Sequence, residues 1–324
     1  MSELDLIIVG AGPAGLTGAL YAGRSMLRTV VLEKGVPGGE LLNTELIEDY
    51  PGFESVKGFE LAEKMAAHAL KFGAELITDG AVSVERAADG LFTIATESGA
   101  RYRAPAVLLT AGGTPTKLGV PGEVEYAGKG TSYCAVCDGH FFRGEVLGVV
   151  GGGDAAVEES EFLTRYASKV WLIHRRAELR ASKILQQRLF ENPKIEVIWD
   201  TVVERIEGNG KGVTHLALRH VQTGATSALP VGGVFIFVGF RPNTGIVKGH
   251  VAHDAGGYIL ANEHMMSSIP GLFVAGDVRA QLTRQVTTAV GDATTAVIAA
   301  TRYLAEHKEQ QHREVGGAAG HHAD

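Results

Sequence analysis

The chain carries one short pattern twice, and this repeat constrains the fold more than any other feature. Each copy consists of an apolar strand, a glycine-rich turn, a helix and a second apolar strand, over residues 5–34 and again over 146–176. In the second copy we expect the helix over residues 157–167 and the last strand over 169–176. Strands without polar alternation are typical of buried parallel sheets. The repeat therefore predicts an α/β protein with two Rossmann-like dinucleotide-binding domains, each built on a βαβ unit.

In the first copy, Gly10, Gly12 and Gly15 form a GxGxxG turn between strand and helix. The first glycine makes the turn, the second lets a pyrophosphate approach the backbone, and the third lets helix and strand pack closely. The N–H groups at the start of the helix then face the phosphates. Glycine-rich turns can be purely structural, but this position between strand and helix favours a dinucleotide site.

The second copy has Gly151, Gly153 and Ala156 at the same spacing, and alanine is permitted at the third place. The two copies differ 23 residues after their first glycine, where one has Glu33 (33 − 10) and the other His174 (174 − 151). An acid at this place accepts hydrogen bonds from a ribose 2′-hydroxyl, whereas a basic cluster accommodates a 2′-phosphate.

His174 begins a basic cluster that Arg175 and Arg176 continue, and Arg180 lies one helical turn further on. We therefore expect FAD or NAD at the first turn and NADP at the second, although the arginines could also be a solvated run of charge. Two different dinucleotides in one chain imply electron transfer between them. NADPH delivers a hydride, and a flavin accepts it and passes electrons to a dithiol.

Cys134 and Cys137 are the only cysteines in the chain. One interpretation is half of a zinc site, but no other cysteine exists and His140 alone cannot complete four ligands. A second is a pair of inert buried thiols, which would need no such spacing. We favour a redox disulfide, in which nearby dipoles stabilise one thiolate, and we expect no bound metal.

Three residues close to the cysteine pair are further candidates. Asp138 could give or take a proton at a leaving thiolate, with a plain Asp-Gly turn as the alternative. Of Phe141 and Phe142 we expect at least one in the core, while an exposed one could anchor a protein partner.

Bulk properties exclude several classes of protein. The net charge of −7 argues against nucleic acid or an anionic membrane as partner. No run reaches the ~18 apolar residues of a membrane span. Two cysteines in 324 residues exclude a disulfide-stapled secreted scaffold. Because the acidic start enters a strand at once, we expect no signal peptide and a cytoplasmic protein.

Two segments look like crossings between domains: residues 107–122, dense in Gly and Pro, and 234–245, where an apolar strand ends in a Pro-Asn turn. We expect a discontinuous first domain of residues 1–113 and 245–312, ending in a helix from about Thr288 to Glu306. The second domain, residues 114–244, is inserted into it. Residues 313–324 lack periodicity and are expected to form a disordered tail.

Seven segments, in this order, closely resemble those of low-molecular-weight bacterial thioredoxin reductases, which are pyridine nucleotide-disulfide oxidoreductases. They are "VGAGPAG", "GGELLNTELIEDYPG", "CAVCDG", "GGGDAAVEE", "HRRAELRA", "GFRPNT" and "VAGDVRAQLTRQV", and the likeness runs from about residue 5 to 310. The resemblance implies a homodimeric flavoprotein that uses NADPH to reduce thioredoxin through FAD and the cysteine pair. It places FAD in the discontinuous domain and NADPH in the inserted one.

The same resemblance implies roles for single residues. Cys137 would be the flavin-side thiol, Asp138 the acid-base group and Asp277 a ligand of the flavin's ribityl or phosphate part. The sequence departs from the family at Glu40, where a glutamine usually follows two glycines. A carboxylate there could alter a hydrogen bond at the flavin edge or the flavin's potential.

The expected cofactor-binding residues form two sets. The FAD set is Gly10, Gly12, Pro13, Ala14, Gly15, Glu33, Gly39, Glu40, Leu41, Asn43, Gly276, Asp277, Arg284, Gln285 and Val286, the last three lining the isoalloxazine by resemblance. The NADPH set is Gly151, Gly153, Asp154, Ala155, Ala156, His174, Arg175, Arg176 and Arg180.

Other functions are compatible with these motifs. A similar flavoprotein could reduce a different disulfide carrier, or could take electrons from ferredoxin, although the intact second glycine turn argues against ferredoxin. A redox-sensing protein could hold flavin and nucleotide without turnover. A ferredoxin–NADP reductase of this architecture would lack the cysteine pair.

Overall fold

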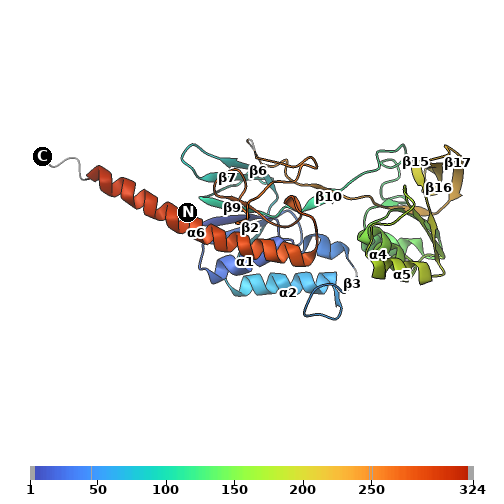
Figure 1. Cartoon of the computed structure of the whole chain (residues 1–324), viewed down its shortest axis with the longest axis horizontal. Helices are drawn as coiled ribbons and strands as arrows, with labels where there is room; N and C mark the ends of the chain where they lie inside the picture. The colour runs from blue at the N-terminus through green and yellow to red at the C-terminus, as the bar shows by residue number, and fades with distance from the viewer. Residues whose placement is uncertain (1–3, 45, 248, 250, 320–324) are drawn as a thin grey trace. The chain divides into compact units, whose positions relative to one another are not determined.

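A computed structural model of the chain describes residues 4–44, 46–247, 249 and 251–319. The chain divides into two compact units, Met1–Thr114 with Pro242–Asp324 and Pro115–Arg241. These boundaries lie one and three residues from the crossings expected at 113/114 and 244/245. We describe each unit by itself, with the labels of Figure 1.

The discontinuous unit is built on a five-stranded parallel sheet in the order β20-β9-β1-β2-β5. Its strands are β1 (Leu6–Val9), β2 (Thr29–Glu33), β5 (Glu75–Thr78), β9 (Ala106–Leu109) and β20 (Leu272–Val274). In the register of the central strand, Leu6 lies opposite both Thr29 and Ala106. The expected parallel βαβ unit is therefore confirmed at the centre of this sheet.

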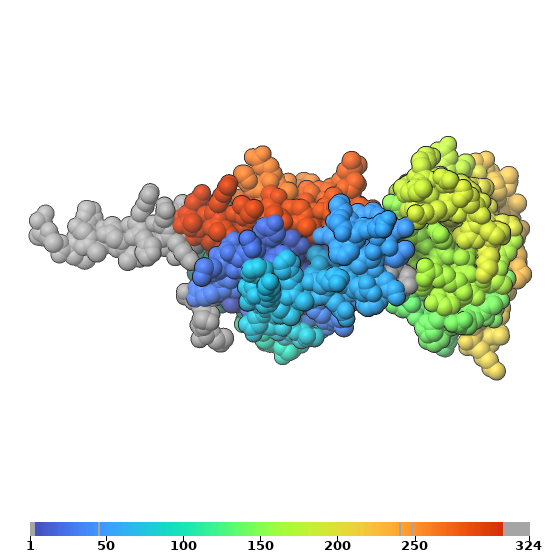
Figure 2. Space-filling view, turned by 90° about the horizontal axis from the view of Figure 1, so that it is seen from below, coloured from blue at the N-terminus to red at the C-terminus, as the bar shows by residue number. Residues whose placement is uncertain are grey.

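Both faces of β1 are buried, because successive side chains of a strand point to opposite faces. Leu6 and Ile8 belong to a core shared with three helices, α1 (Pro13–Arg24), α2 (Gly58–Lys71) and α6 (Val286–Ala319). Ile7 and Val9 belong to a core shared with an antiparallel sheet of β6 (Ala81–Arg86), β7 (Phe92–Thr96) and β8 (Arg101–Ala104). Figure 1 shows the helices on one side of the parallel sheet and the antiparallel strands on the other, and Figure 2 views the unit from its helical side.

The inserted unit repeats this architecture. Its five-stranded parallel sheet has the order β11-β18-β12-β13-β14, with strands β11 (Thr131–Ser132), β12 (Val146–Gly151), β13 (Lys169–Ile173), β14 (Ile195–Ile198) and β18 (Gly233–Phe237). One face packs on the helices α3 (Ala135–Asp138), α4 (Asp154–Leu163) and α5 (Lys183–Glu191). The other packs on an antiparallel sheet of β15 (Thr201–Gly208), β16 (Val213–His220) and β17 (Thr226–Pro230). The predicted α/β class with two Rossmann-like units is confirmed.

The remaining short elements are β3 (Leu46–Ile47), β4 (Val56–Lys57), β10 (Gly113–Pro115) and β19 (Phe240–Pro242), with the 3₁₀ turns η1 (Gly39–Asn43), η2 (Gly139–Phe142) and η3 (Gly276–Val278). Among the described residues, no helix is both long and apolar enough to cross a membrane.

Three elements differ from the sequence expectation. α4 begins at Asp154 instead of residue 157, because Gly153 is extended and the helix starts directly after it. β13 ends at Ile173, so the basic cluster lies in the following loop. α6 continues past Glu306 to Ala319, which makes the first part of the expected tail helical. The Glu, Lys, Gln and Arg residues after Glu306 are good helix formers, and residues 320–324 lie outside the described part.

Candidate functional site

The first glycine turn is held so tightly that two of its glycines leave no room for a side chain. Gly10 has a φ of +100°, and a Cβ added there would lie 2.5 Å from the Thr110 carbonyl oxygen. A Cβ on Gly15 would lie 1.8 Å from the Gly10 carbonyl oxygen. The Thr110 hydroxyl, which the sequence did not single out, donates to the Gly10 carbonyl at 2.8 Å.

The middle glycine of this turn is different, because the protein leaves space beside it. A Cβ on Gly12 would meet only the Gly39 Cα, at the ordinary contact distance of 3.8 Å. The fold therefore does not explain why glycine stands at position 12. A pyrophosphate lying on the backbone would need that space, so the turn fits a bound dinucleotide.

Glu33 lies at the glycine turn, as the motif requires. Its Oε2 accepts the Ala11 N–H at 2.7 Å and its Oε1 accepts the Gly35 N–H at 3.1 Å. Pro13 opens α1, where its missing N–H costs no helical hydrogen bond. The acceptor expected for a ribose hydroxyl is thus held beside the N-terminus of α1.

Segments from distant parts of the chain meet around this turn. Gly276 has a φ of +71°, and a Cβ there would lie 3.1 Å from the Ala14 Cβ. The buried Leu41 and the half-buried Val286 belong to one apolar cluster. Together with the Gly12–Gly39 approach, these contacts bring three of the predicted flavin-binding segments into one region of the unit.

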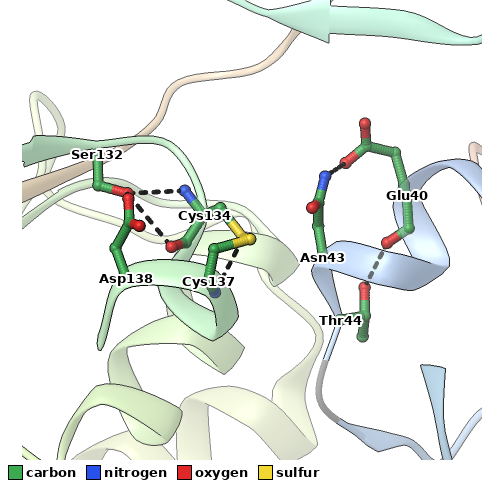
Figure 3. The surroundings of a disulfide bond; sticks show 7 residues. All are labelled: Glu40, Asn43, Thr44, Ser132, Cys134, Cys137 and Asp138. Atoms are coloured by element: carbon green, nitrogen blue, oxygen red, sulfur yellow. Dashed lines mark hydrogen bonds between the residues drawn. A yellow bond between two sulfur atoms is a disulfide. The ribbon is translucent and has the colours of Figure 1, made fainter. Parts of the chain in front are cut away.

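Two carboxyl groups lie in these segments. Desolvation raises the pKa of Glu40, while the hydrogen bond from Asn43 (3.1 Å, Figure 3) opposes the shift. Burial also raises the pKa of Asp277, and the Arg284 guanidinium opposes that shift. Arg284 itself stacks on the Tyr258 ring at 3.8 Å. The protein environment therefore disfavours both negative charges.

A partly buried ion pair that the sequence analysis missed supports the Asp277 turn. Arg279 donates to both carboxylate oxygens of Asp292, at 3.0 and 2.9 Å, and Asp292 also accepts the Gly276 N–H at 3.2 Å. Asp292 belongs to α6, 16 residues further along the chain. No spacing rule connects it to the turn, so the sequence alone gave no signal for it.

In the second glycine turn too, packing requires one glycine while another has open space beside it. A Cβ on Gly151 would lie 2.5 Å from both the Ala156 Cβ and the Phe237 carbonyl oxygen. Gly153 has nothing within 4 Å of an added Cβ. Asp154 and Ala155 begin α4, and Ala156 is buried against the sheet core. This turn too leaves open the one position where a phosphate would approach.

His174 does not lie with the arginines, contrary to the sequence expectation. It is only 6% exposed, and its Nδ1 and Nε2 lie 2.7 and 3.0 Å from the carbonyl oxygens of Gly151 and Glu178. A Cβ on Gly152 would lie 2.2 Å from the ring, so His174 packs directly on the glycine turn. Its side chain packs between two loops of the protein, with both ring nitrogens facing carbonyl oxygens.

The arginines lie on the loop that His174 holds. Arg175, Arg176 and Arg180 are exposed. The Arg180 backbone N–H donates to the Gly152 carbonyl at 2.7 Å, and the Ser182 N–H donates to Asp154 Oδ1 at 2.6 Å. The arginine loop is therefore fastened to the glycine turn by backbone and side-chain bonds, with its three guanidinium groups at the surface.

The cysteines form a disulfide at the start of α3. Their Cα atoms are 5.4 Å apart, and the Cys137 N–H donates to Cys134 Sγ at 3.1 Å. In the reduced protein such a donor favours the charged form of the accepting sulfur. Cys134 is half-buried and Cys137 is exposed.

The segment before the disulfide is anchored by a buried carboxylate. Glu123 is 1% exposed and accepts from the Leu118 and Gly119 N–H groups, at 2.9 and 2.6 Å, and from the Tyr133 hydroxyl at 2.7 Å. Burial and this hydrogen bond raise the pKa of Tyr133 above its usual range. Asp138, on the other side of the disulfide, accepts from the Ser132 hydroxyl.

A cavity of about 240 Å³ lies beside Asp138 and is lined in addition by residues 128–132, Phe141, Phe142 and Gly232. Phe142 packs edge-on against the buried Phe235 and is part of the core. Phe141 is 73% exposed. One phenylalanine is therefore structural and the other is presented to solvent.

Within the described residues, no group of three or more His, Cys, Asp or Glu side chains is arranged to hold a metal ion.

Comparison with known proteins identifies close relatives of the whole chain. The pyridine nucleotide-disulphide oxidoreductase family matches residues 4–293. The chain is 47% identical over 306 residues to the thioredoxin reductase of Listeria innocua, covering 94% of this chain and 95% of that protein. It is 46% identical over 307 residues to the thioredoxin reductase of Bacillus subtilis, covering 94% and 96%. The solved thioredoxin reductase of Lactococcus lactis superposes with a TM-score of 0.92 at 42% identity, covering 94% of this chain and 100% of that one.

Gly151 and Gly153 form a matched pair for testing the second turn. We expect Gly153→Ala to keep the free energy of unfolding within about 0.5 kcal/mol of wild type while raising the Kd for NADP⁺ at least about tenfold. Gly151→Ala should lower the free energy of unfolding by about 1–3 kcal/mol, because the added methyl overlaps Phe237. Denaturant titration and calorimetric binding measure both. An unchanged Kd for NADP⁺ in Gly153→Ala would show that no phosphate binds at this turn.

Replacing His174 and replacing the arginines should have different effects on nucleotide binding. Arg175→Ala with Arg176→Ala should raise the Kd for NADP⁺ by about 10–100-fold and leave that for NAD⁺ nearly unchanged, because only NADP⁺ carries the 2′-phosphate. His174→Ala should weaken both nucleotides by a similar factor, because it loosens the glycine turn they share. A loss confined to NADP⁺ in His174→Ala would instead support direct contact with the 2′-phosphate.

Proposed function

Because the chain belongs to the pyridine nucleotide-disulphide oxidoreductase family, and within it to the low-molecular-weight thioredoxin reductases, we propose that it uses NADPH and FAD to reduce the disulfide of thioredoxin. The observation that carries the proposal is the Cys134–Cys137 disulfide, which lies in the same unit as the second glycine turn. The inserted unit thus contains both the site for the electron donor, NADPH, and the disulfide that accepts the electrons. The flavin of the other unit connects them.

FAD is assigned to the discontinuous unit. The support is the open position at Gly12, the carboxylate of Glu33 at the turn and the contact of the Gly276 turn with Ala14. Gly12 would leave room for the pyrophosphate, Glu33 would accept from the adenosine ribose, and Asp277 would accept from the ribityl chain. A hydroxyl donor at Asp277 would favour its ionised form, opposing the effect of burial.

NADPH is assigned to the inserted unit. The support is the open position at Gly153 and the exposed guanidinium groups of Arg175, Arg176 and Arg180 on a fastened loop. A guanidinium binds a phosphate through two parallel charge-assisted hydrogen bonds, which an NADH ribose cannot offer. The arginines would therefore select NADPH, while His174 holds the loop that carries them.

The cysteine pair passes electrons to the protein substrate. When bound, the flavin supplies two-electron chemistry between a nicotinamide and a disulfide. The Cys137 N–H would stabilise a Cys134 thiolate, which suits Cys134 for attack on the thioredoxin disulfide and leaves Cys137 as the flavin-side thiol. Asp138 would take and return the proton that this exchange moves.

The exposed Phe141 and the cavity beside Asp138 offer a contact surface for thioredoxin next to the disulfide. An exposed aromatic ring next to a reactive group is a typical anchor of a protein interface.

We further propose a cytoplasmic homodimer, for which light scattering of the FAD-loaded protein and cell fractionation are the tests. A monomeric mass in solution would exclude the homodimer.

The experiment that tests the function is steady-state reduction of thioredoxin by the flavin-loaded protein, with NADPH and NADH measured side by side. We expect turnover with NADPH to exceed that with NADH by at least about tenfold, because the 2′-phosphate contributes binding energy only to NADPH. Cys137→Ser should abolish turnover while the flavin stays bound. If the flavin bleaches with NADPH but thioredoxin is not reduced, another disulfide carrier is the substrate.

Phe141→Ala tests the contact surface. We expect kcat/KM for thioredoxin to fall by about 10–30-fold through a higher KM, as for loss of a central interface aromatic. Reduction of a small aromatic disulfide should stay unchanged, because it needs no protein interface. Phe190→Ala is the matched control, since Phe190 is an exposed phenylalanine (59%) on α5 of the same unit. Equal thioredoxin kinetics in the two variants would exclude Phe141 from the interface.

A further inference from the structure

Ser132 is a buried hydroxyl next to the reactive disulfide. It ends β11, where it lies opposite Phe235 of β18, and it is only 4% exposed. Strand pairing fixes its backbone, so the side chain has a defined direction toward the segment that follows. That segment contains Cys134, Cys137 and Asp138.

The Ser132 hydroxyl connects Asp138 with the backbone of Cys134 (Figure 3). Its Oγ lies 2.6 Å from Asp138 Oδ2 and accepts the Cys134 N–H at 3.1 Å. The same Oγ lies 3.2 Å from the Cys134 carbonyl oxygen. A hydroxyl has one proton to donate, and the carboxylate is the closer and more strongly accepting partner. The hydroxyl therefore donates to Asp138 while it accepts from Cys134.

This arrangement fixes the carboxylate in a way that Asp138 could not achieve alone. Asp138 is the last residue of the four-residue helix α3 and is half-buried beside the cavity. Its side chain would otherwise sample several rotamers, and a proton acceptor must lie within hydrogen-bond reach of the group it serves. The bond from Ser132 ties one carboxylate oxygen to the strand and leaves the other for the proton.

We infer that Ser132 is a positioning residue for disulfide exchange, which holds Asp138 where it moves the proton between sulfur atoms. The inference rests on the proposed function. In the exchange, a thiolate of the reduced pair attacks one substrate sulfur, which breaks the substrate S–S bond and forms a mixed disulfide. The second sulfur of the pair then attacks, re-forming the Cys134–Cys137 bond and releasing the substrate as a dithiol. The electron pair and both thiol protons pass to the substrate, and Asp138 carries one of these protons.

The test compares variants of Ser132 in the FAD-loaded enzyme, with thioredoxin and with 5,5′-dithiobis(2-nitrobenzoate) as acceptors. We expect Ser132→Ala to lower kcat about tenfold with both acceptors, within the range that acid-base groups contribute. The KM for NADPH and the rate of flavin bleaching by NADPH should stay at the wild-type values. Ser132→Thr and Ser132→Val form a pair of equal shape that differs only in the hydroxyl. We expect kcat to return toward the wild-type value in Ser132→Thr and not in Ser132→Val. This pair also tests the inference if Ser132→Ala does not fold.

A double-mutant cycle with Asp138→Asn separates positioning from a general structural role. In the Asp138→Asn background, Ser132→Ala should cause no further loss of kcat, because the carboxylate it positions is already gone. Ser98→Ala is the matched control, since the Ser98 hydroxyl donates to Asp79 at 2.5 Å in the other unit and should not affect turnover.

The outcomes distinguish failure of the Ser132 inference from failure of the proposed function. Unchanged kcat in Ser132→Ala, or an equal loss with and without Asp138, overturns the inference while wild-type turnover preserves the proposed function. A wild-type enzyme that reduces neither acceptor overturns the function, and the inference falls with it because no exchange step is left for Asp138 to serve.

Discussion

Close approaches between backbone atoms shape the two places where a central strand turns into a helix. A carbonyl oxygen of a neighbouring segment lies where a side chain would be at Gly10, Gly15 and Gly151. These contacts bring each helix N-terminus to the carboxyl edge of its sheet, where its free N–H groups are available. The proposed flavin site, the proposed nucleotide site and the loops around them all depend on these turns.

The same turns contain two glycines that the protein does not need for itself. At Gly12 and Gly153 an added Cβ would meet no close neighbour, although glycine is the costlier residue for folding. Space at these two positions supports the proposal that a phosphate lies against each turn. This contrast between neighbouring glycines separates binding from packing more sharply than the motif does, because the motif treats all three glycines alike.

The repeat of strand, turn, helix and strand was enough to predict both parallel sheets, because buried parallel strands have uniform apolar sequences. Contacts between distant segments could not be predicted in this way. Asp292 supports the Gly276 turn from a helix, and nothing in its sequence context connects the two. Ser132 lies two residues before Cys134, yet only the fold shows that its hydroxyl reaches Asp138.

His174 lies apart from the arginines for a related reason. A histidine followed by two arginines has the composition of a phosphate site, but sequence does not fix which side chain turns inward where a strand ends. The strand ends at Ile173, and the imidazole turns inward to two carbonyl oxygens while the arginines turn outward. The exposed basic cluster therefore consists of the arginines alone, and the buried His174 ring holds the loop that carries them.

The bonds that fasten the arginine loop have a consequence for how a nucleotide enters. His174 and the Arg180 N–H hold this loop on the Gly151–Gly152 turn. A preorganised site loses little conformational entropy on binding, so more of each phosphate contact remains as affinity. Association then needs no rearrangement of the loop, and nucleotides that differ in one phosphate are distinguished mainly by how long they stay bound. At the proposed NADPH site, discrimination of this kind would be kinetic selection by residence time, which follows from the bonds that hold the loop.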